Sequence, residues 1–296
     1  MGLAALDIAD RDLLQRYLKI FPENESSECT FSNMFIWAKG DRIEWAIEND
    51  TLLLHTYTGN VPCLMTAFCE PAKLARGLET AIDLMHSRSE AFRMCSLPQW
   101  YVDHIEASMP GKFVFTREEH HDDYIYETKS LTELSGRDLH GKRNHINKFH
   151  NLFENRFEFQ PYTRDMFADC MDAYFRWYEE QGSSAELDWE RDSVERALRH
   201  VDELGLKAAV IRVDGKVEAF TVGERITRDM ALIHIEKANY NVAGLFSVIN
   251  QMFLENTFGD TMWVNREEDM GIEGLRRAKR SYKPARMVLK YGATLK

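Results

Sequence analysis

The most unusual run of side chains in the sequence lies between residues 276 and 290. It contains seven basic residues and no acidic one, namely Arg276, Arg277, Lys279, Arg280, Lys283, Arg286 and Lys290. Lysine binds phosphate as a point charge and arginine as a two-pronged donor. Lys279 and Lys283 are four residues apart and therefore share one face of a helix. The run predicts a phosphate-binding surface; the alternative is a solvated face that offsets acidic charge elsewhere.

A second candidate site joins a strand to a helix. Residues 230–238 alternate like a strand, a polar loop follows, and the apolar periodicity of residues 245–258 predicts a helix. The first turn of such a helix presents unpaired N–H groups and the positive end of the helix dipole, which attract anions. We therefore expect Lys237, Asn239 and Gly244 to help bind an anionic ligand.

Two further groups of polar residues accompany these. Asn265 and Arg266 follow a short strand, where donor and acceptor groups often converge in α/β sheets. A surface ion pair between Arg266 and Glu267 is the alternative. Lys142 and Arg143 lie on a predicted basic helix, which either reaches the same cleft or faces solvent.

The elements that must position these residues are clearest in the second half of the chain. Asp214-Gly215 stands between two alternating segments and is a strong hairpin signal, to which residues 230–238 add a third strand. Helices and strands then alternate over residues 245–258, 261–265, 271–282 and 286–291. A helix over residues 165–181 carries an aromatic stripe, interpreted as core or as a pocket wall: Phe167, Tyr174, Phe175, Trp177 and Tyr178.

The first half of the chain predicts a smaller α/β unit. A hairpin is expected within residues 42–57 and a helix over residues 71–87, followed by a strand, a helix and a strand up to residue 117. The polar stretch EEHHDDYI (118–125) is typical of a linker. We therefore predict two domains, residues 1–123 and 124–296.

Three segments resemble a known family. They are LHGKRNHINKF (139–149), EKANYNVAGLFSVINQMF (236–253) and VNREEDMGIEGLRRAKRSYKP (264–284). They resemble the DUF2156 proteins, which are similar to the C-terminal domain of phosphatidylglycerol lysyltransferase and, more distantly, to the Fem aminoacyltransferases. The resemblance implies an α/β (α+β) fold of two tandem GNAT-like acyl-CoA N-acyltransferase domains, with mixed central sheets flanked by helices and the working site in the second domain.

The same resemblance implies roles for two residues. GNAT-type enzymes often place a carboxylate general base where Glu236 stands, and a tyrosine that protonates the leaving group where Tyr282 stands. Both chemistries are sound, since a carboxylate can accept the proton of an attacking amine and a phenol can return one. The alternatives are that Glu236 forms an ion pair with Lys237 or with a residue of the basic run 276–290, and that Tyr282 packs its ring and forms a local hydrogen bond.

Composition narrows the class of protein. The formal net charge is −11 over 296 residues, and residues 1–125 carry 20 acidic and 11 basic side chains, so long-range charge disfavours nucleic acid except at a basic patch. No apolar run reaches the roughly 18 residues of a membrane span, and the start lacks a basic signal-peptide region, so we expect a cytoplasmic protein. The five cysteines are expected to be free thiols rather than disulfides or a zinc site.

Together these observations predict an acyl- or aminoacyltransferase. The donor would be a phosphate-bearing co-substrate, acyl-CoA or aminoacyl-tRNA, and the acceptor an amine or hydroxyl, with attack on the activated carbonyl and no metal. Consecutive Glu, His and Asp residues at 119–123 rarely fit one metal shell and read as a loop. The alternative is an anion-binding or scaffold protein that keeps the fold without the chemistry.

Overall fold

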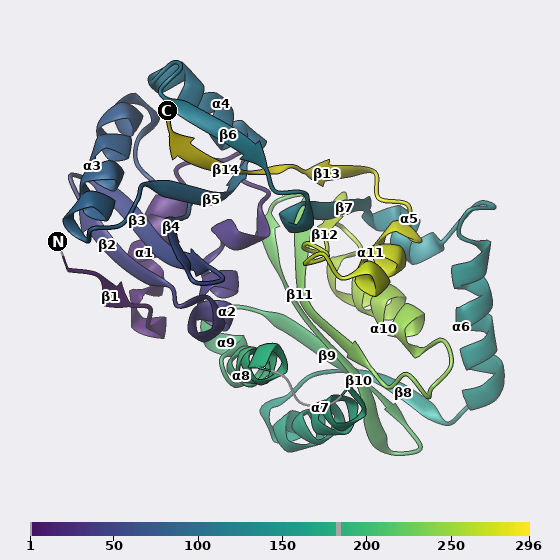
Figure 1. Ribbon diagram of the computed structural model, residues 1–296. Coiled ribbons are helices and arrows are strands. Elements are labelled where there is room, and N and C mark those ends of the chain that lie inside the picture. The colour runs from purple at the N-terminus through teal and green to yellow at the C-terminus, as the bar shows by residue number, and fades with distance from the viewer. Residues whose placement is uncertain (1, 182–184) are drawn as a thin grey trace. The chain divides into compact units, whose positions relative to one another are not determined.

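The chain folds into two compact units, shown in the computed structural model of Figure 1. The structure describes residues 2–181 and 185–296, with the side chains of residues 178–188 left out. Unit 1 comprises Met1–Asp123 and Val288–Lys296, and unit 2 comprises Tyr124–Met287. The C-terminal residues 288–296 therefore belong to unit 1, whereas the sequence placed them in the second domain.

Unit 1 is built on a seven-stranded mixed sheet in the order β1-β2-β3-β4-β5-β14-β6. Its elements are β1 (Ala4–Ala5), α1 (Arg11–Leu18), α2 (Phe31–Asp41), β2 (Glu44–Glu48), β3 (Thr51–Thr58), β4 (Val61–Leu64), α3 (Leu74–Ser87), β5 (Arg93–Pro98), α4 (Gln99–Ser108), β6 (Phe113–Arg117) and β14 (Lys290–Leu295). Strands β2, β3 and β4 form an antiparallel meander, and β5 runs parallel to β4. Helix α3 connects β4 to β5, as a parallel crossover requires.

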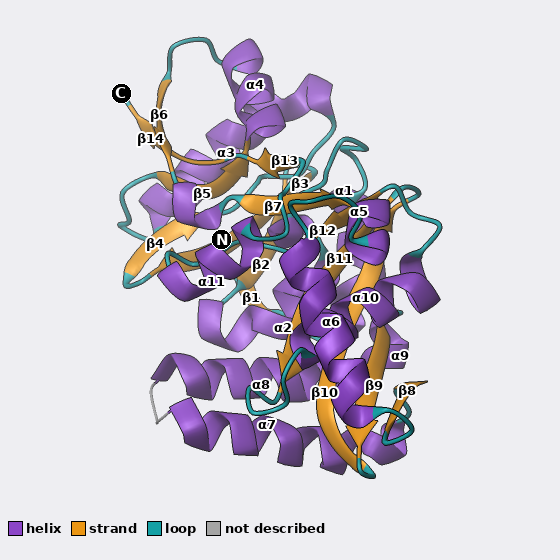
Figure 2. Cartoon of the chain, turned by 90° about the vertical axis from the view of Figure 1, so that its right-hand side faces the viewer, coloured by secondary structure: helices purple, strands orange, loops and turns teal. Residues whose placement is uncertain are grey.

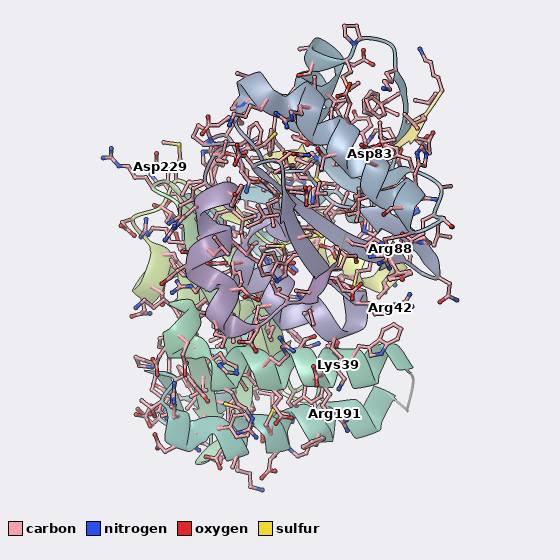
Figure 3. The ribbon with its side chains drawn as sticks, turned by 90° about the vertical axis from the view of Figure 1, so that its left-hand side faces the viewer. Lys39, Arg42, Asp83, Arg88, Arg191 and Asp229 are labelled. Atoms are coloured by element: carbon pink, nitrogen blue, oxygen red, sulfur yellow. A yellow bond between two sulfur atoms is a disulfide. The ribbon has the colours of Figure 1, made fainter. Side chains whose placement is uncertain are left out.

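Helix α3 illustrates why these residues form these elements. Its apolar side chains recur at helical spacing and are buried, among them Leu74, Leu78 and Met85. Asp83 is exposed on the same helix and is labelled on α3 in Figure 3. The periodicity in the sequence is thus converted into one packed face and one solvated face.

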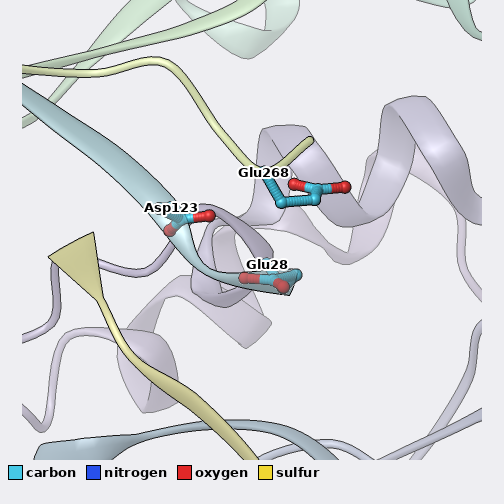
Figure 4. A group of neighbouring side chains, drawn as sticks. All are labelled: Glu28, Asp123 and Glu268. Atoms are coloured by element: carbon cyan, nitrogen blue, oxygen red, sulfur yellow. The ribbon is translucent and has the colours of Figure 1, made fainter. Parts of the chain in front are cut away.

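The interior of unit 1 also contains a buried group of charges. Lys290, at the start of β14, is fully buried and forms ion pairs with Glu28 and with Asp123, whose Oδ1 lies 3.4 Å from Nζ. Ser27 donates to Asp123 from its backbone N–H at 2.9 Å and from its hydroxyl at 2.8 Å. Figure 4 shows the carboxylates of Glu28 and Asp123. These contacts attach the last strand of the chain to unit 1.

One cysteine prediction is wrong. Cys63 on β4 and Cys95 on β5 form a disulfide, with Cα atoms 6.1 Å apart, whereas Cys29, Cys69 and Cys170 are free and buried. The two cysteines are 32 residues apart in sequence. They meet because β4 and β5 are parallel neighbours, which cysteine spacing alone does not reveal.

Unit 2 is built on a second seven-stranded mixed sheet, in the order β13-β7-β12-β11-β10-β9-β8. Its elements are β7 (Asp123–Glu127), α5 (Thr128–Glu133), α6 (His140–Phe153), β8 (Phe157–Pro161), α7 (Phe167–Gln181), α8 (Ala185–Arg199), α9 (Val201–Leu204), β9 (Lys207–Val213), β10 (Lys216–Thr227), β11 (Met230–Ala238), α10 (Leu245–Phe253), β12 (Trp263–Asn265), α11 (Glu273–Arg280) and β13 (Arg286–Val288). Strand β12 pairs in parallel with β11, and β9, β10 and β11 are antiparallel.

The hairpin predicted at Asp214-Gly215 is present. Both residues have positive φ, 50° and 80°, and Lys216 on β10 pairs directly with Val213 on β9. Two consecutive positive φ values match the right-handed twist of the flanking strands, which is why the Asp-Gly dipeptide favours this turn. The expected final strand over residues 286–291 is in fact two strands, with β13 in one sheet and β14 in the other.

Helices cover the two faces of the sheet in unit 2 differently. Helices α6 and α10 pack together with the meander strands in one apolar core, which includes Phe149, Val248 and Ile233. Helix α7 packs on β10, and α8 lies beside α7, on the opposite side of the sheet (Figures 1 and 2). Among the described residues, no helix combines the length and the apolar character needed to cross a bilayer.

Candidate active site

The centre of the candidate site is a buried ion pair between β11 and the loop after β12. Arg266 Nη2 lies 2.9 Å from Glu236 Oε1, and their side chains are 11% and 13% exposed. Asn250 on α10 donates to the other carboxylate oxygen, Oε2, at 2.9 Å. Beyond Leu232, β11 has no register partner on β12. The ion pair therefore occupies the place where the parallel strands separate.

Two buried polar atoms in this cluster have no hydrogen-bond partner among the described residues. They are Nη1 of Arg266, a donor, and Oδ1 of Asn250, an acceptor. Leaving a buried polar atom unpaired costs about 1–3 kcal/mol, so native structures seldom do so without a reason. A ligand that offers both an acceptor and a donor would satisfy the two atoms.

Tyr282 and Lys142 complete the cluster. The Tyr282 hydroxyl donates to Ser247 Oγ at 3.2 Å, and burial raises the pKa of this phenol. Lys142 Nζ lies 3.8 Å from the centroid of the Tyr282 ring, and the Arg266 guanidinium carbon lies 4.9 Å from it. Burial, together with the charge of Arg266, lowers the pKa of Lys142 to about 8. The site thus combines a carboxylate, a phenol and two cations.

Lys279 supports the loop after β12, which carries Arg266. It is buried, and its ammonium donates to the carbonyl oxygens of Arg266, Glu267 and Glu268 at 2.5, 3.1 and 2.5 Å. Asn265 is also buried and accepts from the Glu267 N–H at 2.7 Å. Both residues hold the loop after β12 in shape. The structure therefore gives the three donors of Lys279 to main-chain carbonyls rather than to a ligand phosphate.

The basic run 276–290 is divided by the fold. Arg276 forms a bidentate pair with Asp269 at 2.8 and 3.0 Å, Lys279 supports the loop, and Lys290 is buried in unit 1. Burial raises the pKa of Asp269, but hydrogen bonds from Arg276 and Tyr124 lower it to about 2. Lys283 is exposed at a positive φ of 57°, just beyond α11. Lys279 and Lys283 therefore do not form one phosphate-binding face.

The start of α10, where the sequence predicts an anion site, packs against α6. Gly244 caps α10 with a φ of 87°, and a Cβ on Gly244 would lie only 2.1 Å from the carbonyl oxygen of His145 on α6. The backbone N–H of Ser247 bonds to the Gly244 carbonyl at 2.9 Å, and that of Leu245 to Val242 at 3.2 Å. Helix α6 therefore lies against one side of this helix start, and the anion site expected from the sequence stays a prediction.

Arg143 and Lys142 are neighbours on α6 but have different environments. Arg143 donates to the carbonyl oxygen of Leu134 and so fixes the segment between α5 and α6. Lys142 faces Tyr282 instead. Only the lysine of this predicted pair lies in the candidate site.

Lys237 and Asn239 lie on the other face of the sheet. Successive residues of a strand point to opposite faces, so Lys237 points away from Glu236. It lies 4.0 Å from the centroid of the Trp177 ring and 2.5 Å from Glu190, and burial lowers its pKa. Asn239 donates to Glu218 at 2.8 Å.

A small pocket of about 60 Å³ opens beside this second group. Its lining includes Trp177 and Lys237 together with Arg176, Glu218, Phe220 and Asn239. Trp177 is therefore the member of the aromatic stripe that lines a pocket, while Tyr174 is buried in the core and the Tyr178 side chain lies outside the described residues. The stripe therefore contributes both to the core, through Tyr174, and to a pocket wall, through Trp177.

Several residues of the cluster carried no signal in the sequence. Asn250 and Ser247 lie within the apolar pattern of α10, where polar residues look incidental, and both are buried. Tyr126 on β7 lies 5.7 Å from the Arg266 guanidinium and donates its hydroxyl to the Lys279 carbonyl at 2.9 Å. These contacts join segments more than 100 residues apart. Ser247 and Asn250 are the two that the helical pattern could have marked, as polar residues on the buried face of an apolar helix.

Comparison with solved structures gives the fold a name. A conserved protein of unknown function from Bacteroides thetaiotaomicron VPI-5482 superposes with a TM-score of 0.90 at 30% identity over 100% of both chains. L-PGS from Bacillus licheniformis superposes with a TM-score of 0.68 at 13% identity, over 97% of this chain and 92% of that one. A tandem GNAT protein from the clavulanic acid biosynthesis pathway gives 0.51 at 9% identity, over 98% and 97%. The fold is therefore the expected tandem GNAT-like arrangement.

The sequence comparisons agree with this fold. An uncharacterized protein of Mycoplasmoides gallisepticum is 24% identical over 169 residues, which is 57% of this chain. The match covers 54% of that protein, so it spans about half the length of this curated relative. The family described as phosphatidylglycerol lysyltransferase, C-terminal, matches residues 21–294. The chain, with its charged cluster in the second of two GNAT-like units, belongs to the phosphatidylglycerol lysyltransferase C-terminal family.

Proposed function

We propose that the protein is an aminoacyltransferase that moves an aminoacyl group from a tRNA ester to an amine or hydroxyl acceptor at the Glu236–Arg266 cluster. The observation that carries this proposal is the pair of unpartnered buried atoms, Arg266 Nη1 and Asn250 Oδ1. An aminoacyl ester offers the carbonyl oxygen and the ammonium group that these two atoms require. Membership of the family supports the same class of reaction.

The proposed mechanism uses Arg266 to stabilise developing charge. Attack on the ester carbonyl places negative charge on its oxygen, and a donor already fixed in a buried site stabilises that charge without reorganising. Glu236 fixes the guanidinium through Nη2, which leaves Nη1 for the substrate. Because both oxygens of Glu236 already accept hydrogen bonds, we assign it to orienting Arg266 and attracting the donor ammonium rather than to proton abstraction.

Tyr282 retains its proposed role as an acid. Burial raises the pKa of its phenol, so the proton is held until a strongly basic leaving group develops beside it. Its hydroxyl currently donates to Ser247, which gives it a defined direction. Replacing Tyr282 by phenylalanine tests this role while keeping the ring that Lys142 contacts.

The close packing of α6 against the start of α10 favours aminoacyl-tRNA over acyl-CoA as the donor. A GNAT-type coenzyme A site needs the N–H groups of this helix start, and here the His145 carbonyl lies against Gly244. Arg277, Arg280 and Lys283 are exposed around α11 and are suited to contacts with a nucleic-acid backbone. In a chain with a net charge of −11, such binding should weaken steeply with added salt.

The test compares donors directly. The purified protein is incubated with tRNA carrying one labelled amino acid at a time, including lysine, or with acetyl-CoA. Acceptors are phosphatidylglycerol vesicles, free amines and hydroxyl compounds. We expect labelled product from an aminoacyl-tRNA, none from acetyl-CoA, and loss of product in Arg266→Ala.

Two outcomes would contradict the proposal. Thiol release from acetyl-CoA that depends on Arg266 would make the protein an acyl-CoA transferase. Binding of aminoacyl-tRNA without transfer to any acceptor would favour the alternative, a ligand-binding protein that retains the fold. An exposed lysine on α6, Lys148, gives a matched control when changed to alanine.

A further inference from the structure

Lys142 is a half-buried cation of the cluster whose ammonium faces an aromatic ring rather than a protein acceptor. Its Nζ faces the Tyr282 ring at 3.8 Å, and among the described residues it has neither a hydrogen-bond acceptor nor an ion-pair partner at contact distance. An ammonium carries three donors, and partial burial without acceptors favours the neutral amine. Lys279 shows the opposite case, since three carbonyls accept from it.

The groups that face Lys142 come from three other elements. Arg266 after β12 repels a positive charge on Nζ, Glu236 on β11 attracts it, and Tyr282 after α11 presents its ring face. Burial and Arg266 outweigh Glu236, which places the pKa of Lys142 at about 8. This lysine therefore exchanges a proton close to neutral pH, where an ordinary lysine remains charged.

We propose that Lys142 is the base of the transfer reaction: it receives the proton of the attacking acceptor and returns it to Tyr282, which protonates the leaving oxygen. This inference rests on the proposed aminoacyl transfer. A bond forms between the acceptor nitrogen or oxygen and the ester carbonyl carbon, and the ester carbon–oxygen bond breaks. The acceptor proton moves to the neutral amine of Lys142, while Tyr282 protonates the leaving oxygen of the tRNA ribose. The Lys142 ammonium then returns a proton to the Tyr282 phenolate beside it, so both side chains end as they began.

A competing role for Lys142 is to bind an anion of the substrate as a fixed positive charge. The two roles predict opposite effects of pH. A base works only when it is neutral, so the rate should rise as pH passes about 8 and level off above it. An anion-binding ammonium would instead lose its effect as pH rises through the same range.

The experiment measures kcat/KM for aminoacyl transfer from pH 6 to 10 in the wild type and three variants. Lys142→Ala removes the amine, Lys142→Arg keeps a positive charge that does not titrate, and Lys148→Arg on the same helix is the control. Dividing the wild-type rate by the Lys142→Ala rate removes the titrations of donor and acceptor, because both enzymes share them. We expect this ratio to rise with pH and to reach about 100-fold or more.

Lys142→Arg should be as impaired as Lys142→Ala, and Lys148→Arg should match the wild type. Trimethylamine, which accepts a proton but forms no stable amide, should partly restore Lys142→Ala. Activity of Lys142→Arg within a few-fold of the wild type, or a ratio that falls with pH, would overturn the inference alone. Absence of transfer by the wild type from every aminoacyl donor would overturn the proposed function, and the inference with it.

Discussion

Units 1 and 2 share one strand topology and differ in the side chains that lie where two parallel strands of the sheet separate. In both, an antiparallel three-strand meander is followed by a helix and then by a strand parallel to the third strand of the meander. In unit 1 the pairing of β4 with β5 is a single register pair, Leu64 with Met94. In unit 2 the pairing of β11 with β12 stops at Leu232 and Asn265. Each sheet therefore has a separation that side chains must fill.

Unit 1 fills this place with a neutral, satisfied side chain. Tyr101 on α4 is fully buried; its hydroxyl donates to the Ala67 carbonyl at 2.7 Å and accepts from the Ala67 N–H at 3.1 Å. Unit 2 fills it with Glu236 and Arg266 and leaves two polar atoms unpaired. The same place in the shared fold thus holds a satisfied neutral side chain in unit 1 and an ion pair with two unpaired polar atoms in unit 2, and this difference is why we propose the chemistry for unit 2.

The largest expected effect comes from breaking the ion pair of unit 2. Arg266→Ala should lower the transfer rate by about 100-fold or more. It should also destabilise the protein by about 3–5 kcal/mol, because it leaves the Glu236 carboxylate buried and unpaired. The measurements are transfer rate and urea unfolding. The double variant Arg266→Met/Glu236→Leu should regain stability without regaining activity; recovery of activity would show that the pair has no chemical role.

The matching change in unit 1 should affect stability alone. Lys290→Ala leaves the buried carboxylates of Glu28 and Asp123 without their cation, which should cost about 3–5 kcal/mol. At low temperature, where the variant is still folded, kcat should equal that of the wild type. A large fall in kcat of the folded variant would remove the contrast between the two units.

The two tyrosines provide the most direct comparison. Tyr282→Phe should lower turnover at least about tenfold with little change in unfolding free energy, since Ser247 loses one hydrogen bond and the ring remains. Tyr101→Phe should leave turnover unchanged and cost about 1–3 kcal/mol, because the N–H and carbonyl of Ala67 lose their partner. The measurements are turnover and unfolding free energy for both variants. If the two variants lowered turnover equally, or lost equal stability, our assignment of Tyr282 would be contradicted.

A smaller effect concerns pH and a histidine of unit 2. His234 is buried between Glu224 and Glu267, with nitrogen–oxygen distances of 3.1 and 3.0 Å. Burial lowers the pKa of His234, but hydrogen bonds to both carboxylates outweigh it and raise the pKa to about 9. Since the folded-state pKa is above the unfolded value of about 6.5, this contribution to stability is complete below pH 6.5 and is lost as pH rises through 9.

The check on this prediction is urea unfolding at pH 6, 7.5 and 9 for the wild type and His234→Gln. Wild-type stability should decline over this range more steeply than that of the variant. If the unfolding free energies of the wild type and the variant declined equally with pH, the pKa of His234 would not be raised in the folded protein. Transfer activity at pH 7 should be similar in both proteins if they are equally folded, because His234 makes its contacts outside the Glu236–Arg266 cluster.

The sequence was informative where a signal lies within a few residues. The Asp214-Gly215 hairpin, the strand ending near Ala238 and the helix beginning at Leu245 are all present at the predicted positions. The family resemblance correctly gave the tandem GNAT-like fold. The candidate residues Glu236, Arg266, Tyr282 and Lys142 do lie together, although the sequence offered no distance between them.

Other site residues were grouped by sequence proximity and separated by the fold. Glu236 and Lys237 are adjacent, yet the alternation of a strand sends them to opposite faces, a consequence that the period of two already contains. Lys279 belongs to a basic run, yet three carbonyls bind its ammonium. Gly244 begins a helix as expected, yet the backbone of His145 on α6 packs directly against it.

By itself the sequence determined the local elements, the family and the residue types available for chemistry. These properties depend on periodicity, turn dipeptides and short motifs, whose interactions reach only a few residues along the chain. The tertiary structure alone decided that Lys142 faces Tyr282, that Cys63 pairs with Cys95 and that the last strand completes unit 1. Those contacts join segments far apart in sequence, and burial and charge then fix which side chains are satisfied and which remain open to a substrate.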